Sequence, residues 1–112
     1  MDLSTFDEVV QFSQGSLAID PASFYREFKK VKNGRGKKGK RFPLPFILTL
    51  IMLGKMAGQT KISGIVDWIK ERKIPLKKLL NWPKEFPVHS TYDDALAKCD
   101  KQDLLKAIES VI

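Results

Sequence analysis

The chain has 112 residues, a formal net charge of +7 and a single cysteine. This length predicts one domain over 1–112, and the lone cysteine excludes an intrachain disulfide, which favours a reducing compartment. The acidic start of the chain is unlike a secretory signal. Its most apolar run, 44–53, has ten residues, whereas a membrane-spanning helix needs about 20. We therefore expect a cytoplasmic protein with no membrane partner.

Apolar residues recur at helical spacing in the first half of the chain, and helix-ending residues separate three segments. The first segment covers 3–14. The second begins at Asp20 and Pro21, which are favoured at the N-cap and first helical positions, and it ends by Gly34. The third, about 44–57, is apolar on nearly all sides, which predicts a central helix surrounded by the others.

The second half of the chain predicts four more segments: a helix over 60–72, a short helical turn over 76–80, a helix from about 90 and a last helix from 100. Thr60 and Asp100 are the expected N-caps. Trp82 and Phe86 lie in a proline-rich loop and are expected to pack onto the core, and Leu105 is expected to face inward. No segment alternates like a strand. The predicted fold is all-α, a compact single-domain bundle of five to six helices with a basic Gly/Lys-rich loop.

Two glycines lie around the turn that joins the third and fourth predicted helices. Gly54 and Gly58 have a spacing that allows another helix to approach closely. The short turn also allows a helix-turn-helix motif. However, the outer face of 60–72 is poor in the Arg, Asn and Gln that read bases. An ordinary helical hairpin is the favoured interpretation.

The positive charge is concentrated in one segment, 29–41, which holds eight basic residues and no acid. The other 99 residues contain 12 basic and 13 acidic residues, a net charge of −1. The glycine-rich part, 34–41, predicts an exposed, flexible loop. Lysines and arginines in such a loop can follow a phosphate backbone without reading bases. A merely solvated loop and another anionic partner, an acidic protein surface or a membrane face, are the alternatives.

No set of residues predicts catalysis, a metal site or a cofactor. The segment 34–40 matches most of a phosphate loop, but Arg41 replaces the required Ser or Thr and the segment follows a helix instead of a strand. His89 and Cys99 are the only histidine and cysteine, too isolated for a zinc site. Ser90 beside His89 lacks the geometry of a catalytic triad. Cys99 continues an apolar stripe and is expected in the core.

Four short motifs follow one another in the order of a known family. They are Arg-Phe-Pro-Leu at 41–44, Ala-Gly at 57–58, Ile-Val-Asp-Trp at 65–68 and Pro-Val-His-Ser-Thr-Tyr at 87–92. Over about residues 20–110, the chain resembles the N-terminal helical, transposase-associated domain of bacterial ISAs1-type (H-repeat-associated) insertion-sequence transposases. The Pro-Ser-His-Asp-Thr of that family reads Pro-Val-His-Ser-Thr here. The family's catalytic carboxylates lie on a downstream RNase H-like core, so the resemblance implies an accessory domain without catalytic residues.

Charge and resemblance together predict a non-enzymatic, DNA-binding accessory domain of transposase type. The residues expected to contact nucleic acid are Lys29, Lys30, Lys32, Arg35, Lys37, Lys38, Lys40, Arg41, Lys61 and Lys70. The alternative is a helical protein-interaction module, a subunit, adaptor or inhibitor of a complex that processes nucleic acid. It would dock through the basic loop or through an exposed Trp68 or Trp82. A homo-oligomer also stays open.

Overall fold

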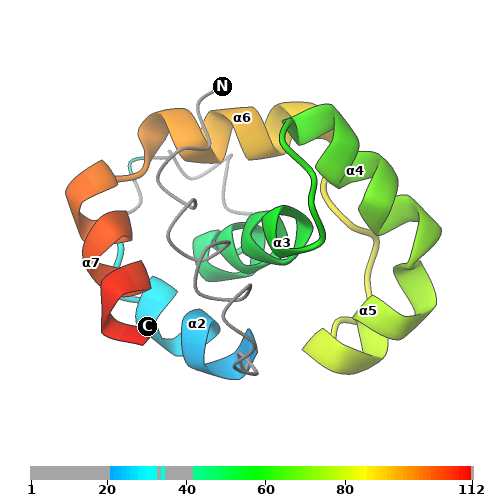
Figure 1. Ribbon diagram of the computed structural model, residues 1–112, viewed down its shortest axis with the longest axis horizontal. Coiled ribbons are helices and arrows are strands. Elements are labelled where there is room, and N and C mark those ends of the chain that lie inside the picture. Colours follow the sequence, from blue (N-terminus) through cyan, green and yellow to red (C-terminus); the bar gives the residue numbers. More distant parts are fainter. Residues whose placement is uncertain (1–20, 33, 35–41, 112) are drawn as a thin grey trace.

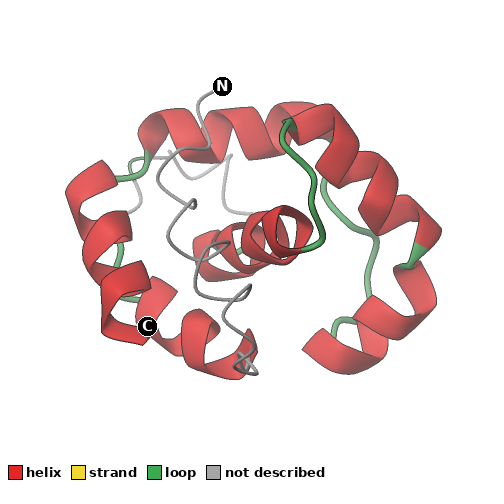
Figure 2. Ribbon diagram, viewed as in Figure 1, coloured by secondary structure: helices red, strands yellow, loops and turns green. Residues whose placement is uncertain are grey.

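The fold is built from helices alone in the part of the chain that the computed structural model describes, residues 21–32, 34 and 42–111 (Figures 1 and 2). These helices are α2 (Pro21–Phe28), α3 (Leu44–Met56), α4 (Ile62–Glu71), α5 (Lys73–Leu80), α6 (His89–Lys98) and α7 (Lys101–Val111). The prediction of an all-α bundle is confirmed. The helix predicted over 3–14 lies outside the described residues.

Helix α3 lies at the centre of the bundle, with the other helices arranged around it (Figure 1). Ten of its 13 residues are buried, as its all-round apolar sequence predicts. Pro43 is its N-cap and Pro45 lies in its first turn, where a helix needs no N–H donor. The one hydroxyl in this buried helix, on Thr49, donates to the carbonyl oxygen of Pro45 at 2.7 Å, so it is not left without a partner.

The two glycines of the α3–α4 connection have different roles. Gly54 packs against Ile65 of α4, which confirms the predicted close helix contact at that position. Gly58 contacts no such neighbour and has a φ of 98°, a left-handed conformation that favours glycine. The N–H of Gln59 donates to the carbonyl of Gly54 at 3.0 Å and closes the end of α3. For Gly58 the predicted packing role was therefore wrong, because this residue makes the turn.

Two predicted helix boundaries in the α4–α5 region were wrong. Lys61 precedes α4 as its N-cap in place of Thr60, and its side chain makes no capping hydrogen bond. The helical turn predicted over 76–80 begins earlier, at Lys73, directly after the non-helical φ of −126° at Arg72. Pro75 is the third residue of this helix, where its missing N–H removes no helical hydrogen bond.

Helix α7 begins where a capping residue predicts it. The Oδ1 atom of Asp100 accepts hydrogen bonds from the N–H groups of Gln102 at 2.9 Å and Asp103 at 3.0 Å. Leu104 and Ile108, one turn apart, are fully buried. Leu105 is 39% exposed, because it lies about 100° around the helix from Leu104. The expectation that Leu105 faces inward was wrong.

The loop between α5 and α6 is held to α3 by aromatic stacking. The ring of Trp82 lies 4.1 Å from that of Phe46, and the ring of Phe86 lies 6.0 Å from the same Phe46. The indole N–H of Trp82 donates to the carbonyl of Glu85 at 3.0 Å. The predicted packing of both loop aromatics onto the core is confirmed. Helix α6 starts at His89, one residue before the predicted start.

None of the described helices has the length and apolar character that crossing a membrane would require.

Candidate nucleic-acid interface

Three predicted contact residues lie at the end of α2. Lys29 and Lys30 follow its last turn and are exposed, as is Lys32. The ammonium of Lys29 lies over the ring of Tyr25, 5.4 Å from its centroid. Lys30 forms an ion pair with Glu27 at 3.0 Å. Glu27 therefore offsets part of the charge of Lys30, whereas no ion pair offsets Lys32 in the part of the chain that the structure describes.

The backbone at this start of the basic segment is fixed to the α6–α7 junction. The N–H of Lys32 donates to Oδ2 of Asp103 at 3.2 Å, and its carbonyl accepts from the N–H of Asp100 at 3.1 Å. The N–H of Gly34 donates to the carbonyl of Lys98 at 3.2 Å. A Cβ atom at Gly34 would lie 2.5 Å from that same carbonyl oxygen, so the contact requires glycine. The backbone at the start of the segment is thus held to the folded domain by hydrogen bonds.

The remaining predicted cations of this segment lie outside the described residues: Arg35, Lys37, Lys38, Lys40 and Arg41. The chain is described again from Phe42, which is buried. The ring of Phe42 lies 6.0 Å from that of Trp82. The end of the basic segment, like its start, therefore joins a packed part of the molecule.

The structure does not bring Lys61 and Lys70 together with the lysines that follow α2. Both are exposed, Lys61 just before α4 and Lys70 in its last turn. Figure 1 shows the end of α2 and α7 on one side of α3, and α4 and α5 on the other. Lys61 and Lys70 are separated from each other by the length of α4, about 14 Å along the helix axis. The predicted site residues therefore fall into separate groups.

A second cationic surface, of which the sequence interpretation named only Lys70, lies at the end of α4, along α5 and in the loop that follows. Residues 70–84 contain six basic residues and one acid, Glu71. The basic residues are Lys70, Arg72, Lys73, Lys77, Lys78 and Lys84. These residues do not stand out in the net charge of −1 outside 29–41, because 1–20 has a net charge of −4 and 85–112 a net charge of −3. Counting charge in short windows would have found this surface.

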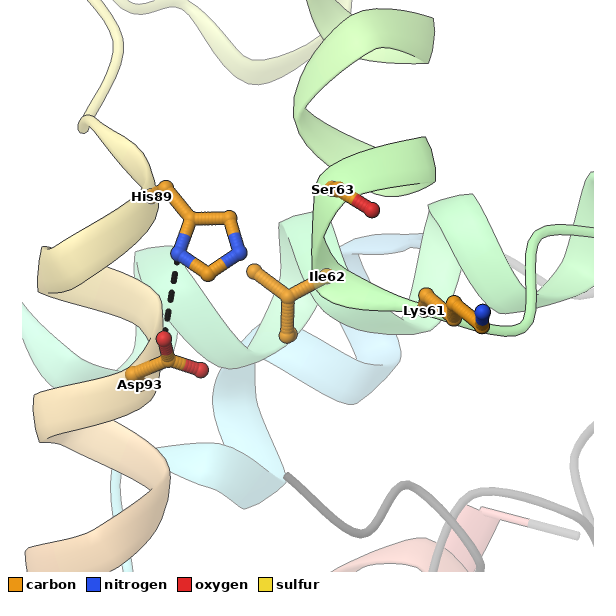
Figure 3. Close-up of a pocket in the computed structure, with 5 residues that line it drawn as sticks. All are labelled: Lys61, Ile62, Ser63, His89 and Asp93. Carbon is orange, nitrogen blue, oxygen red and sulfur yellow. Dashed lines mark ion pairs between the residues drawn. The ribbon is translucent and has the colours of Figure 1, made fainter.

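A pocket of about 370 Å³ lies between the starts of α4 and α6 (Figure 3). Nδ1 of His89 lies 3.0 Å from Oδ2 of Asp93, one turn further along α6. The hydroxyl of Ser63 points away from the imidazole, and Lys61 lies on the far side of Ser63 (Figure 3). Among the residues that the structure describes around this pocket, no nucleophile is directed at the His–Asp pair in the way that acyl transfer requires.

Cys99 is a core residue, as its position in the apolar stripe predicts. It is buried beside Leu96, and burial raises the pKa of its thiol, an effect that the nearby Lys101 partly opposes. A raised pKa keeps the thiol protonated and weakly reactive. In the described part of the chain, no three His, Cys, Asp or Glu residues are grouped so that they could hold a metal ion.

Comparison with models of known protein families identifies the kind of domain to which these residues belong. The family model described as DDE_Tnp_1-associated matches residues 25–111. The chain belongs to the DDE_Tnp_1-associated family. No curated protein and no solved structure matches it. The resemblance to a transposase-associated domain, inferred from the four motifs, is confirmed.

The DDE_Tnp_1-associated match begins within α2 and extends to the end of α7, so it contains both the basic segment and the second cationic surface. What matches is the transposase-associated region and not a catalytic core. The family therefore indicates a transposase-related accessory role for the domain.

Proposed function

We propose that this transposase-associated domain contacts the phosphate backbone of DNA through its basic segment, residues 29–41. The observation that carries the proposal is the grouping of eight cations without an acid in a domain of a transposase-associated family. Each phosphate that a lysine or arginine neutralises releases condensed counterions. Such contacts provide affinity and orientation but little sequence discrimination.

The exposure of Lys29 and Lys32 and the fixed backbone at Lys32 support this proposal. A cation on a fixed backbone loses less conformational entropy when it meets a phosphate. Lys61 and Lys70 lie on the other side of α3 from the start of the basic segment, so we propose them as auxiliary contacts only.

The experiment is a titration of labelled duplex DNA with the full chain by fluorescence anisotropy at several salt concentrations. If about four cations each meet a phosphate, the slope of log K against log salt is about −3 to −4. The K37Q/K38Q/K40Q/R41Q variant is expected to bind at least about 100-fold more weakly at low salt, with a slope closer to zero.

The matched control removes four charges from the second cationic surface, in the K73Q/K77Q/K78Q/K84Q variant. Its affinity is expected to stay within about threefold of wild type near physiological salt, because screening over about 8 Å isolates the two surfaces. Equal losses in both variants would show that net charge alone attracts DNA. Affinity that does not change with salt would contradict phosphate contact altogether.

The alternative is a protein-interaction module that docks through Trp68 or Trp82. Neither tryptophan is in a suitable position for this role. Trp82 stacks on Phe46 and its indole N–H is already used. Trp68 is partly buried, and the guanidinium of Arg72 lies over its ring at 5.1 Å. Helix α5, in contrast, has exposed aliphatic side chains that a protein partner could contact.

A further inference from the structure

Helix α5 exposes aliphatic side chains on the face turned away from the core. Ile74 is 72% exposed and Leu79 is 58% exposed, whereas Leu76 of the same helix is 5% exposed. Pro75 and Lys78 are exposed as well. Because residues four apart are neighbours on a helix, Ile74 with Lys78 and Pro75 with Leu79 form one continuous strip, the α5 outer face.

Positive charge lies within and beside the α5 outer face. Helix α5 contains Lys73, Lys77 and Lys78 and no acid. Lys73 lies 3.8 Å from Glu85. Lys77 and Lys78 form no ion pair with any residue that the structure describes. The surface therefore combines exposed aliphatic groups with cations whose charge is not balanced locally.

The position of α5 makes this surface accessible. The helix packs on α4 at the outer edge of the bundle, on the opposite side of α3 from α7 (Figure 1). Single exposed aliphatic residues are ordinary, but two of the four large exposed ones in the described chain lie within this eight-residue helix. Protein interfaces combine apolar contacts with polar and charged ones, as the exposed side of this helix does.

We propose that the α5 outer face docks an acidic segment of a partner protein that carries aliphatic side chains beside its carboxylates. Charge complementarity to Lys73, Lys77 and Lys78 would orient the segment, and contact with Ile74 and Leu79 would supply the apolar part of the binding free energy. This docking site is separate from the DNA contact at 29–41 and does not depend on it.

Other polyanions fit this surface less well. A DNA backbone is met by cations and hydrogen-bond donors and has no use for Ile74 and Leu79. An interfacial membrane helix buries a broad apolar face, whereas α5 offers two aliphatic side chains over two turns. The combination of both groups favours a protein segment.

The test is a selection of a random displayed peptide library on the full chain, with removal of peptides that also bind the I74S/L79S variant. We expect the retained peptides to be acidic and to contain aliphatic residues. They should bind I74S/L79S, and separately K73Q/K77Q/K78Q, at least about tenfold more weakly than wild type.

Matched controls come from α7, where Leu105 is also exposed and Lys101 and Lys106 are exposed cations. The L105S and K101Q/K106Q variants should bind the selected peptides within about twofold of wild type, and thermal unfolding verifies that every variant is folded. The proposal is overturned if no peptide depends on α5, or if the retained peptides are neutral or lack aliphatic residues. Duplex DNA or phosphatidylserine vesicles that require Ile74 and Leu79 for binding would overturn it too.

Discussion

Gly54 of α3 lies directly against the branched side chain of Ile65 in α4. A Cβ atom at Gly54 would lie 2.7 Å from Cγ1 and 2.8 Å from Cγ2 of Ile65. A β-branched side chain in a helix has one preferred rotamer, so Ile65 cannot move aside cheaply. The distance between the central helix and α4 is therefore set by the absence of a side chain at Gly54.

Replacing Gly54 with alanine should destabilise the domain although alanine favours helices. The helix propensity gained, at most about 1 kcal/mol, is smaller than the cost of about 1–3 kcal/mol for forcing an extra methyl into a packed core. Urea unfolding followed by circular dichroism measures the difference. Gly64→Ala is the control, because its new methyl would meet only the side-chain end of Gln59, which can move. A G54A variant as stable as G64A would contradict the close contact.

Replacing Tyr92 with phenylalanine should leave the domain as stable or make it more stable. The hydroxyl of Tyr92 is fully buried and has no hydrogen-bond partner among the described residues. A buried polar group without a partner costs about 1–3 kcal/mol, and the substitution removes it while keeping the ring. We expect the free energy of unfolding at neutral pH to rise by up to about 1 kcal/mol. A clear loss of stability would reveal a hydrogen bond to the hydroxyl.

The burial of the Tyr92 hydroxyl also predicts that the domain loses stability at alkaline pH. Burial raises the pKa of Tyr92 well above its usual value, which is about 10 in an unfolded chain. Above that pH the unfolded state releases the phenol proton while the folded state keeps it, so the free energy of unfolding falls as pH rises past about 10. Chemical unfolding of wild type and Y92F across this range should show a smaller fall in the variant. Parallel curves would rule out Tyr92 as the cause.

How much of this could be predicted from sequence depends on the range of the interactions. The buried character of α3 and the cap at Asp100 follow from neighbouring residues, and both were predicted. The exposure of Leu105 could not be, because several registers of an amphipathic helix satisfy one apolar pattern. The separation of Lys61 from Lys29 depends on how helices distant in sequence are arranged around α3. The features that could not be predicted from the sequence therefore depend on contacts between segments that are distant in the sequence.

Replacing Asp100 with alanine should destabilise α7 by about 1 kcal/mol, because the N–H groups of Gln102 and Asp103 lose their shared acceptor. For a domain of this size, thermal unfolding should shift down by about 4 °C. Asp100→Asn keeps an acceptor and should recover most of the loss. Asp94→Ala, which removes an exposed ion pair with Lys98, should cost less than about 0.5 kcal/mol. If D94A and D100A cost the same, the hydrogen bonds to Asp100 would not be the source of the effect.

Replacing Glu27 with glutamine should strengthen DNA binding. The carboxylate of Glu27 is paired with Lys30 at 3.0 Å, and along the sequence it is the acid nearest to the start of the basic segment. Its removal frees the lysine for a phosphate and takes away a repulsive charge. An exposed ion pair is a weak interaction, so we expect a gain of about two- to fivefold at low salt. Anisotropy titrations of labelled duplex DNA provide the measurement.

The control for this gain is Glu71→Gln, which changes the net charge equally but lies beside Arg72 on the other side of α3. If DNA binds at the basic segment, E71Q should change the affinity less than E27Q does. If DNA binds instead along α4 and α5, the order reverses, because Glu71 is the one acid among the six cations of that surface. The ratio of the two affinities therefore identifies the surface that DNA contacts, independently of the attraction that any added positive charge produces.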